Sequence, residues 1–354
     1  MRRYRIMVAI YVAAHAYIWW RLVLPLPSPV WQVGTALIAL LAPSMPILAR
    51  RRSRFTRERG RRWVLVGHLW FGFAAYLLLG ALASHLAVAL GVDRRDSAQL
   101  FGAAAIAVVV AGLLNVARGP VVKRVRVPLP RFAPLTYTIA HLTDVHIGMS
   151  IGREFAETVV RRVNALAPDL IVITGDLIDG RLSDLRDEIA PLQQLRARDG
   201  VFAVTGNHEY YWNVEPWLRH LGSLGIRVLR NEHVTIRGAF ELAGVDDASY
   251  GEDVPRAVAG CDPWLPLVLL AHHPRTVLRA MKAGVDLQLS GHTHGGQLLP
   301  WGWLARLWDP LVSGLGRFGD TWLYVSDGTG YWGPPLRVGT RCEIAAITLT
   351  GGET

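Results

Sequence analysis

Cysteine is scarce in this chain of 354 residues, since Cys261 and Cys342 are the only two. Two cysteines so far apart exclude a disulfide framework and a cage of cysteine ligands around a metal. Charged residues are also few, at 19%, whereas 51% of the residues are hydrophobic. This balance excludes intrinsic disorder and is unusual for an ordinary soluble protein.

Acidic residues are nearly absent from the first third of the chain. Residues 1–131 hold 19 Lys and Arg but only Glu58, Asp93 and Asp96, whereas the remainder holds 19 Lys and Arg and 25 Asp and Glu. The Arg clusters alternate with long apolar runs, a pattern typical of membrane topology rather than of nucleic-acid binding. We therefore expect a membrane anchor over residues 1–131, a separate domain over residues 132–354, and no nucleic-acid partner.

Four apolar runs in the anchor approach the roughly 20 residues that a membrane-spanning helix needs. They cover residues 6–24, 30–48, 64–90 and 100–117. Arg21 interrupts the first run beside two tryptophans, and we expect it to snorkel to the headgroup level. Pro43 and Pro46 should kink the second run or end it early. A cleaved signal peptide is the alternative for the first run, although no small-residue cleavage site follows it.

The basic residues predict the orientation of the anchor. Eight Arg lie between Arg50 and Arg62, between the second and third runs. Such an excess in a short loop marks the cytoplasmic side. Two further crossings would return the chain to the cytoplasm, where more basic residues follow between Arg118 and Arg131. We expect a multi-pass protein of the cell membrane with a cytoplasmic C-terminal domain. The basic clusters are either topology determinants or a site for anionic lipids.

Beyond about residue 135, short apolar strands alternate with amphipathic helices, which is typical of a layered α/β domain. The expected strands cover residues 137–142, 170–174, 201–205, 267–270 and 285–289. Each is followed by Asp, Asn or His, often beside a glycine that lets backbone approach a ligand closely. We expect these five strand ends to converge on one edge of a sheet.

The first strand end illustrates the chemistry. Asp144 and His146 are two residues apart, so in extended chain both side chains point the same way and can meet one ion. A carboxylate and an imidazole so placed suit a divalent metal. Although one such pair alone is more often structural, five strand ends of this kind predict a metal site.

Together, these residues resemble the calcineurin-like metallophosphoesterases in five motifs and in their order. The motifs are Asp144-x-His146, Gly175-Asp-x-x-Asp179, Gly206-Asn-His208-Glu209, His272 and Gly291-His-Thr-His294. The strings GHTHGGQ and VSDGTGYWGPPLR are similar to the bacterial membrane-attached branch of that superfamily. The resemblance covers about residues 135–350. It implies N-terminal transmembrane helices followed by an α/β domain, a two-sheet αββα sandwich.

The resemblance implies two metal sites that share the carboxylate of Asp176. One site would contain Asp144, His146, Asp176 and His294, and the other Asp176, Asn207, His272 and His292. His273 is the alternative to His272, although the string LLAHHP favours His272. Mixed oxygen and nitrogen donors suit Mn, Fe or Zn, and the absence of thiolates from this set argues against a structural zinc site. Two divalent metal ions are therefore the expected cofactors.

The resemblance also implies that His208 acts on the leaving group, and we expect it to be the general acid. Asp179, three residues beyond Asp176, would orient and charge the imidazole. Glu209 is expected to be structural. A hydroxide that bridges the two metals would attack phosphorus in line with the leaving group.

The expected activity is hydrolysis of a phosphomonoester, a phosphodiester or a lipid-linked pyrophosphate. Membrane attachment favours a lipid-linked phosphate, and a soluble ester is the other possibility. One alternative is a membrane sensor or transporter whose metal domain is regulatory, although no internal repeat supports a transporter. Another is an extracellular hydrolase with the inverted topology.

Trp301, Trp303 and Trp308 follow the last expected ligands and have two interpretations. They cover the hydrophobic core, or they form a membrane-facing lip for a lipid-bearing substrate.

Overall fold

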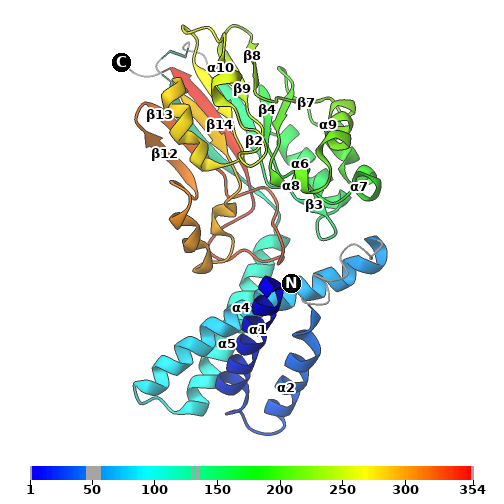
Figure 1. The fold of residues 1–354 in the computed structure, drawn as a ribbon, viewed down its shortest axis with the longest axis vertical. Coiled ribbons are helices and arrows are strands. Elements are labelled where there is room, and N and C mark those ends of the chain that lie inside the picture. The colour runs from blue at the N-terminus through cyan, green and yellow to red at the C-terminus, as the bar shows by residue number, and fades with distance from the viewer. Residues whose placement is uncertain (1, 45–56, 130, 133–135, 352–354) are drawn as a thin grey trace. The chain divides into compact units, whose positions relative to one another are not determined.

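The computed structural model describes residues 2–44, 57–129, 131–132 and 136–351. It divides into two compact units (Figure 1). The first contains Met1–Ala117 together with Gly333–Val338, and the second contains Arg118–Trp332 together with Gly339–Thr354.

The first unit is helical. Helix α1 (Arg2–Ile18) continues into a π-helical turn, η1 (Trp19–Val23), and is followed by α2 (Val30–Leu41), α4 (Arg57–Ala89) and α5 (Arg94–Ala117). Three segments of the described residues are long and apolar enough to cross a membrane, namely Tyr4–Val23, Gly60–Ala89 and Arg94–Ala117. They correspond to the first, third and fourth predicted runs.

The second predicted span is shorter than expected. Helix α2 has 12 residues, or ~18 Å of helix, which is less than the ~30 Å of a bilayer core. It ends at Leu41, just before Pro43, as the prediction of an early end requires. Pro46 and the rest of the run, residues 45–48, lie outside the described residues. About four spans were expected, and among the described residues three segments have the length and composition of a span.

Arg21 also differs from the expectation, because it is buried among helices rather than extended towards the headgroups. Its side chain is 4% exposed, and Nη2 donates to the backbone carbonyl of Ser84 over 2.8 Å. The hydroxyl of Ser97 donates to the same carbonyl. The backbone carbonyl of Ser84 on α4 therefore accepts the hydrogen bond that water would accept from an exposed guanidinium.

A short segment from late in the chain, Gly333–Val338, packs with α4 and α5 in the first unit. Asn115 Nδ2 donates to the backbone carbonyl of Arg337 over 2.9 Å. A side chain on Gly72 would collide with Leu336 and Pro334. Glycine at this position of α4 therefore permits the close approach of the segment.

The second unit contains two six-stranded sheets. The first has the order β1 (Val121–Leu129), β14 (Glu343–Gly351), β2 (Tyr137–Leu142), β4 (Leu170–Thr174), β6 (Val201–Val204) and β7 (Ile226–Val228). The second has the order β12 (Gly314–Phe318), β13 (Thr321–Val325), β11 (Leu287–Ser290), β10 (Leu267–Leu270), β9 (Phe240–Gly244) and β8 (Glu232–Ile236). Two short strands, β3 (Ile147–Gly148) and β5 (Ile178–Asp179), form a separate pair.

The two sheets share one hydrophobic core, which contains buried side chains from both, such as Ile139 and Val172 from the first and Leu242 and Leu270 from the second. Helices flank the sheets (Figure 1). They are α6 (Arg153–Asn164), α7 (Leu182–Ile189), α9 (Val214–Ser223), α10 (Val254–Val258) and α11 (Val277–Ala280). The fold is thus the α/β two-sheet sandwich that the sequence predicts.

Strand β1 lies within the residues that the charge pattern grouped with the anchor. It pairs in parallel with β14 along its whole length. Arg124, Arg126 and Pro128 are exposed, whereas Val127 and Leu129 are buried, which is the alternation of a half-buried strand. Arg124 and Arg126 therefore lie on the solvent face of a sheet. We propose to draw the domain boundary between Ala117 and Arg118, where the compact units divide.

The parallel strands of the two sheets determine where the predicted ligands lie. Strands β2, β4 and β6 are parallel neighbours in the first sheet, and β9, β10 and β11 are parallel neighbours in the second. Parallel neighbours bring their carboxyl ends to one edge. The predicted strands have the bounds of β2, β4 and β10, whereas β6 ends one residue earlier than predicted and β11 begins two residues and ends one residue later.

Candidate metal centre

Loops at five strand ends carry the seven predicted ligands. They follow β2 (Asp144, His146), β4 (Asp176), β6 (Asn207), β10 (His272) and β11 (His292, His294). The structure brings the ligand atoms of six of these residues into two groups, in which they lie within 4.8 Å of one another. One group is Asp144, His146 and His294, and the other is Asp176, His272 and His292.

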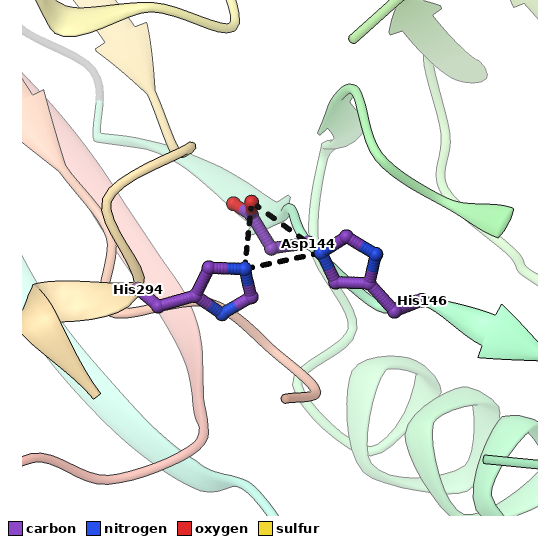
Figure 2. Close-up of side chains that lie close together, drawn as sticks. All are labelled: Asp144, His146 and His294. Carbon is purple, nitrogen blue, oxygen red and sulfur yellow. Dashed lines mark hydrogen bonds and ion pairs between the residues drawn. The ribbon is translucent and has the colours of Figure 1, made fainter. Parts of the chain in front are cut away.

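In the first group, two ring nitrogens and a carboxylate face one point (Figure 2). The Nε2 atoms of His146 and His294 are 3.0 Å apart. Asp144 Oδ1 lies 3.3 Å from His294 Nε2 and 3.9 Å from His146 Nε2. Such a set of donors fits a divalent cation of borderline character.

In the second group, Asp176 is the central residue. Its Oδ2 lies 3.3 Å from His272 Nε2, and His292 Nδ1 lies 3.2 Å from the same His272 nitrogen. Asp176 Oδ2 is also 3.8 Å from Nε2 of His146, which belongs to the first group. One carboxylate therefore lies between the two groups.

Asn207 is the seventh predicted ligand and begins the short helix α8 (Asn207–Tyr211). Its Oδ1 atom is buried and has no hydrogen-bond donor among the described residues. A carbonyl oxygen can only accept, and buried acceptors are normally satisfied. A metal ion would satisfy this oxygen, so the residue fits the predicted role.

The backbone of the site is strained at the predicted ligands. Asp144, His146, Asp176 and His294 each have φ of 51°, and His292 has φ of 70°. This left-handed region is unfavourable for residues other than glycine, and such strain concentrates at functional sites. Two glycines relieve crowding, since a Cβ on Gly206 would collide with Asp176 and one on Gly291 with Asp144.

In the second group, burial and neighbouring charges shift the pKa values of all three side chains. Burial would raise the pKa of Asp176, but the charge and hydrogen bond of His272 hold that pKa well below its usual value. Burial would lower the pKa of His272, but the carboxylate of Asp176 raises it to about 10. Burial and the neighbouring His272 lower the pKa of His292 to about 2. The buried carboxylate of Asp176 thus attracts positive charge, which a divalent metal would supply in place of the His272 proton.

His208 and Asp179 form the predicted pair. His208 Nδ1 donates to Asp179 Oδ1 over 3.2 Å, and its Nε2 lies 3.9 Å from Asp176 Oδ2. Burial would lower the pKa of His208, but the hydrogen bond to Asp179 and the charge of Asp176 raise it. His208 also forms a third group with His146 and Asp176. Its position is therefore compatible with a proton donor or with a metal ligand.

Three aromatic residues beside this pair were not predicted. Trp212 Nε1 donates to the same Asp179 oxygen over 3.0 Å. The rings of Tyr211 and Trp332 lie 5.1 and 6.0 Å from the His208 ring, and both side chains are exposed. The spacing of His208 and Trp212, four residues apart on a helical turn, is the only sequence signal that indicates any of these contacts.

Glu209 and His273, which adjoin predicted ligands in sequence, contact other groups. Glu209 is buried and accepts hydrogen bonds from the backbone N–H groups of Asp176, Leu177 and Gly206, so it is structural as predicted. His273 Nε2 lies 2.9 Å from Asp247 Oδ2. His272, and not His273, belongs to the group with Asp176.

The tryptophans after the last ligands do not all cover the core. Trp303 and Trp308 are 57% and 69% exposed, and Leu304 and Leu307 are exposed with them. They belong to, or directly follow, the 3₁₀ helix η7 (Trp301–Leu307). The core interpretation is therefore wrong for Trp303 and Trp308.

Residues 137–296 match the family model described as calcineurin-like phosphoesterase. The chain is 38% identical over 312 residues to a Danio rerio transmembrane protein with metallophosphoesterase domain, covering 81% of this chain and 71% of the relative. It is 44% identical over 263 residues to the Bos taurus protein of the same name, covering 68% of this chain and 59% of the relative.

Among solved structures, a Thermus thermophilus sulfate thiohydrolase, SoxB, in complex with glycerol is 16% identical to this chain. The match covers 58% of this chain and 53% of that protein, with a TM-score of 0.37.

Proposed function

Because the chain belongs to the calcineurin-like phosphoesterase family and is thus a metal-dependent phosphoesterase, we propose that its reaction takes place among the side chains at these strand ends. The observation that carries this proposal is the position of Asp176. Its Oδ2 lies 3.8 Å from a nitrogen of His146 and 3.3 Å from a nitrogen of His272, one from each ligand group. A shared carboxylate would hold two metal ions close together, as two-metal catalysis of phosphate-ester hydrolysis needs.

Seven residues would hold two divalent metal ions, with Asp176 common to both. Asp144, His146 and His294 would complete one site, and Asn207, His272 and His292 the other. When bound, the metals would lower the pKa of an attacking water and neutralise charge on the phosphate oxygens. Oxygen and nitrogen donors favour Mn, Fe or Zn.

The remaining residues would handle the leaving group. His208 Nε2 would give its proton to the oxygen that departs from phosphorus. Asp179 accepts from Nδ1 and so directs the opposite nitrogen towards the site. The hydrogen bond from Trp212 holds the same carboxylate. Tyr211 and Trp332 flank the imidazole with exposed rings and would contact the leaving group.

The full-length protein in detergent is expected to hydrolyse p-nitrophenyl phosphate, bis-p-nitrophenyl phosphate, or both, in the presence of Mn²⁺. The ratio of the two kcat/KM values would assign the monoester or diester preference. Absence of hydrolysis of both esters by a folded, metal-loaded sample, with each of Mn, Fe and Zn, would contradict the proposed function.

We further propose that the natural ester is lipid-linked. The exposed side chains of Trp303, Leu304, Leu307 and Trp308 form an apolar surface, which we call the lip. A cavity of about 370 Å³ is lined by Trp303, by Arg306 and by Gly295, the neighbour of His294. The lip therefore adjoins a cavity that borders the residue next to His294, and tryptophan with arginine favours a lipid interface.

Replacing Trp303 and Trp308 by Ser is expected to lower kcat/KM about 10-fold for an ester presented in lipid vesicles, because burial of apolar surface in lipid is lost. Hydrolysis of soluble p-nitrophenyl esters should not change. Trp264→Ser is the matched control, since Trp264 is 84% exposed and outside the lip. Equal losses on the soluble and lipid-borne esters would reject the lip.

The positive-inside rule supports a cytoplasmic location for the second unit, since the Arg-rich segment precedes a pair of long apolar helices, α4 and α5. Protease added to intact cells should then leave this unit uncut and should cleave it after permeabilisation. Cleavage in intact cells would support the inverted topology.

A further inference from the structure

A second cluster of metal-binding side chains lies outside the catalytic centre. His233, Glu241 and Cys261 place one ligand atom each within 4.8 Å of one another. Strands β8 and β9 are antiparallel and pair Thr235 with Glu241. His233 is two residues before Thr235, so His233 and Glu241 are diagonal neighbours on one face of the sheet. That face is opposite the shared core, which takes Val234 and Ile236.

Cys261 reaches the same face from the turn after α10. Gly260 adopts φ of 90°, a conformation that favours glycine, and turns the chain back towards β8. A Cβ on Gly260 would lie 4.0 Å from Cε1 of His233, so the turn borders the imidazole. The side chains of Cys261 and His233 are both partly exposed, which gives an ion access from solvent.

A hydrogen bond orients the imidazole of His233 so that one ring nitrogen can bind a metal ion. Its Nδ1 lies 3.0 Å from the backbone carbonyl of Ala257 and donates to it. This hydrogen bond places the proton on Nδ1 and leaves the lone pair on Nε2. Metal-binding histidines are commonly oriented by such a bond to a carbonyl group.

Glu241 brings a buried carboxylate to the cluster. Its side chain is 3% exposed and accepts from Thr235 Oγ1 and from the backbone N–H of Asp262. Among the described residues, no Lys or Arg forms an ion pair with it. A cation beside this buried carboxylate would stabilise it, because buried charges need a partner.

We propose that His233, Glu241 and Cys261 bind a zinc ion that fastens the turn after α10 to the β8–β9 hairpin. A thiolate, an imidazole and a carboxylate form a donor set that suits zinc, with water in the fourth position. Ligand atoms on one tetrahedral zinc lie roughly 3.3–3.8 Å apart, so the observed cluster needs only small side-chain rotations.

This site is distinct from the catalytic centre. Glu241 pairs with Leu267 at the start of β10, and His272 lies beyond the end of that strand. Five residues of extended chain separate the two positions, on the order of 16 Å. The predicted catalytic ligands include no thiolate, so a sulfur signal would report on the second cluster alone.

Titration of the metal-depleted, full-length protein in detergent with Co²⁺ tests the proposal, because cobalt replaces zinc and its bond to sulfur absorbs in the near ultraviolet. The wild type should show this sulfur-to-cobalt band, and Cys261→Ser should lack it. His233→Ala should weaken the binding that produces the band about 10-fold or more. Cys342→Ser is the matched control, since Cys342 is buried outside the cluster, and it should retain the band.

A wild type without the band, or a band that Cys261→Ser retains, would overturn the proposal. Zn²⁺ should also raise the thermal unfolding midpoint of the wild type by more than that of Cys261→Ser, because a ligand that binds only the folded state stabilises it. Equal shifts would contradict the structural role. Neither readout depends on hydrolysis, so the result is independent of the proposed activity.

Discussion

Replacing Asp176 by Asn is expected to reduce kcat/KM for phosphate esters by at least ~10³-fold, because several kcal/mol of metal-derived stabilisation would be lost. The amide keeps the size of the side chain but removes the negative charge that faces both ligand groups. Bound metal should fall from two ions per chain to one or none, as measured by elemental analysis after gel filtration of the full-length protein.

The matched control is Asp187→Asn, which changes an exposed carboxylate on α7. It should retain the metal content and the activity of the wild type. An Asp176→Asn protein that kept two ions and normal hydrolysis would show that this carboxylate is not shared.

Replacing His208 by Ala is expected to lower kcat by ~10²–10⁴-fold for phenyl phosphate, the range for loss of general acid catalysis. The loss should be much smaller for p-nitrophenyl phosphate, because p-nitrophenolate departs without a proton. Metal content should remain at two ions per chain. Kinetics on these two esters, together with elemental analysis of bound metal, distinguish a proton-donor role of His208 from a metal-ligand role.

Asp179→Asn should show the same dependence on the leaving group, with a smaller loss, because it acts through the orientation of His208. His220→Ala removes a histidine from the neighbouring helix α9 and should change neither ester. Loss of one metal from His208→Ala would instead assign His208 to the third ligand group, with His146 and Asp176.

The strands and the loops that bear the predicted ligands were predictable because their signals are local. Short apolar runs such as residues 137–142 and 170–174 end in polar residues, and the structure has strands with these bounds. The parallel order of β2, β4 and β6 then places Asp144, Asp176 and Asn207 at one edge.

Other features depend on contacts that local sequence does not specify. The burial of Arg21 depends on a carbonyl of Ser84, 63 residues later. Strand β1 pairs with β14, more than 200 residues away, while its alternating Arg residues resemble a juxtamembrane basic cluster. Trp332 and the cluster of His233, Glu241 and Cys261 likewise depend on distant segments. Hydropathy alone overestimated the length of α2, whereas Pro43 indicated its early end.

Anomalous scattering from crystals of the full-length protein soaked in Mn²⁺ is the most direct test of the proposed metal centre. We predict two peaks, one among Asp144, His146 and His294 and one among Asn207, His272 and His292, with Asp176 contacting both. A single peak among His146, Asp176 and His208, or no peak at these strand ends, would contradict the assignment of the two-metal site.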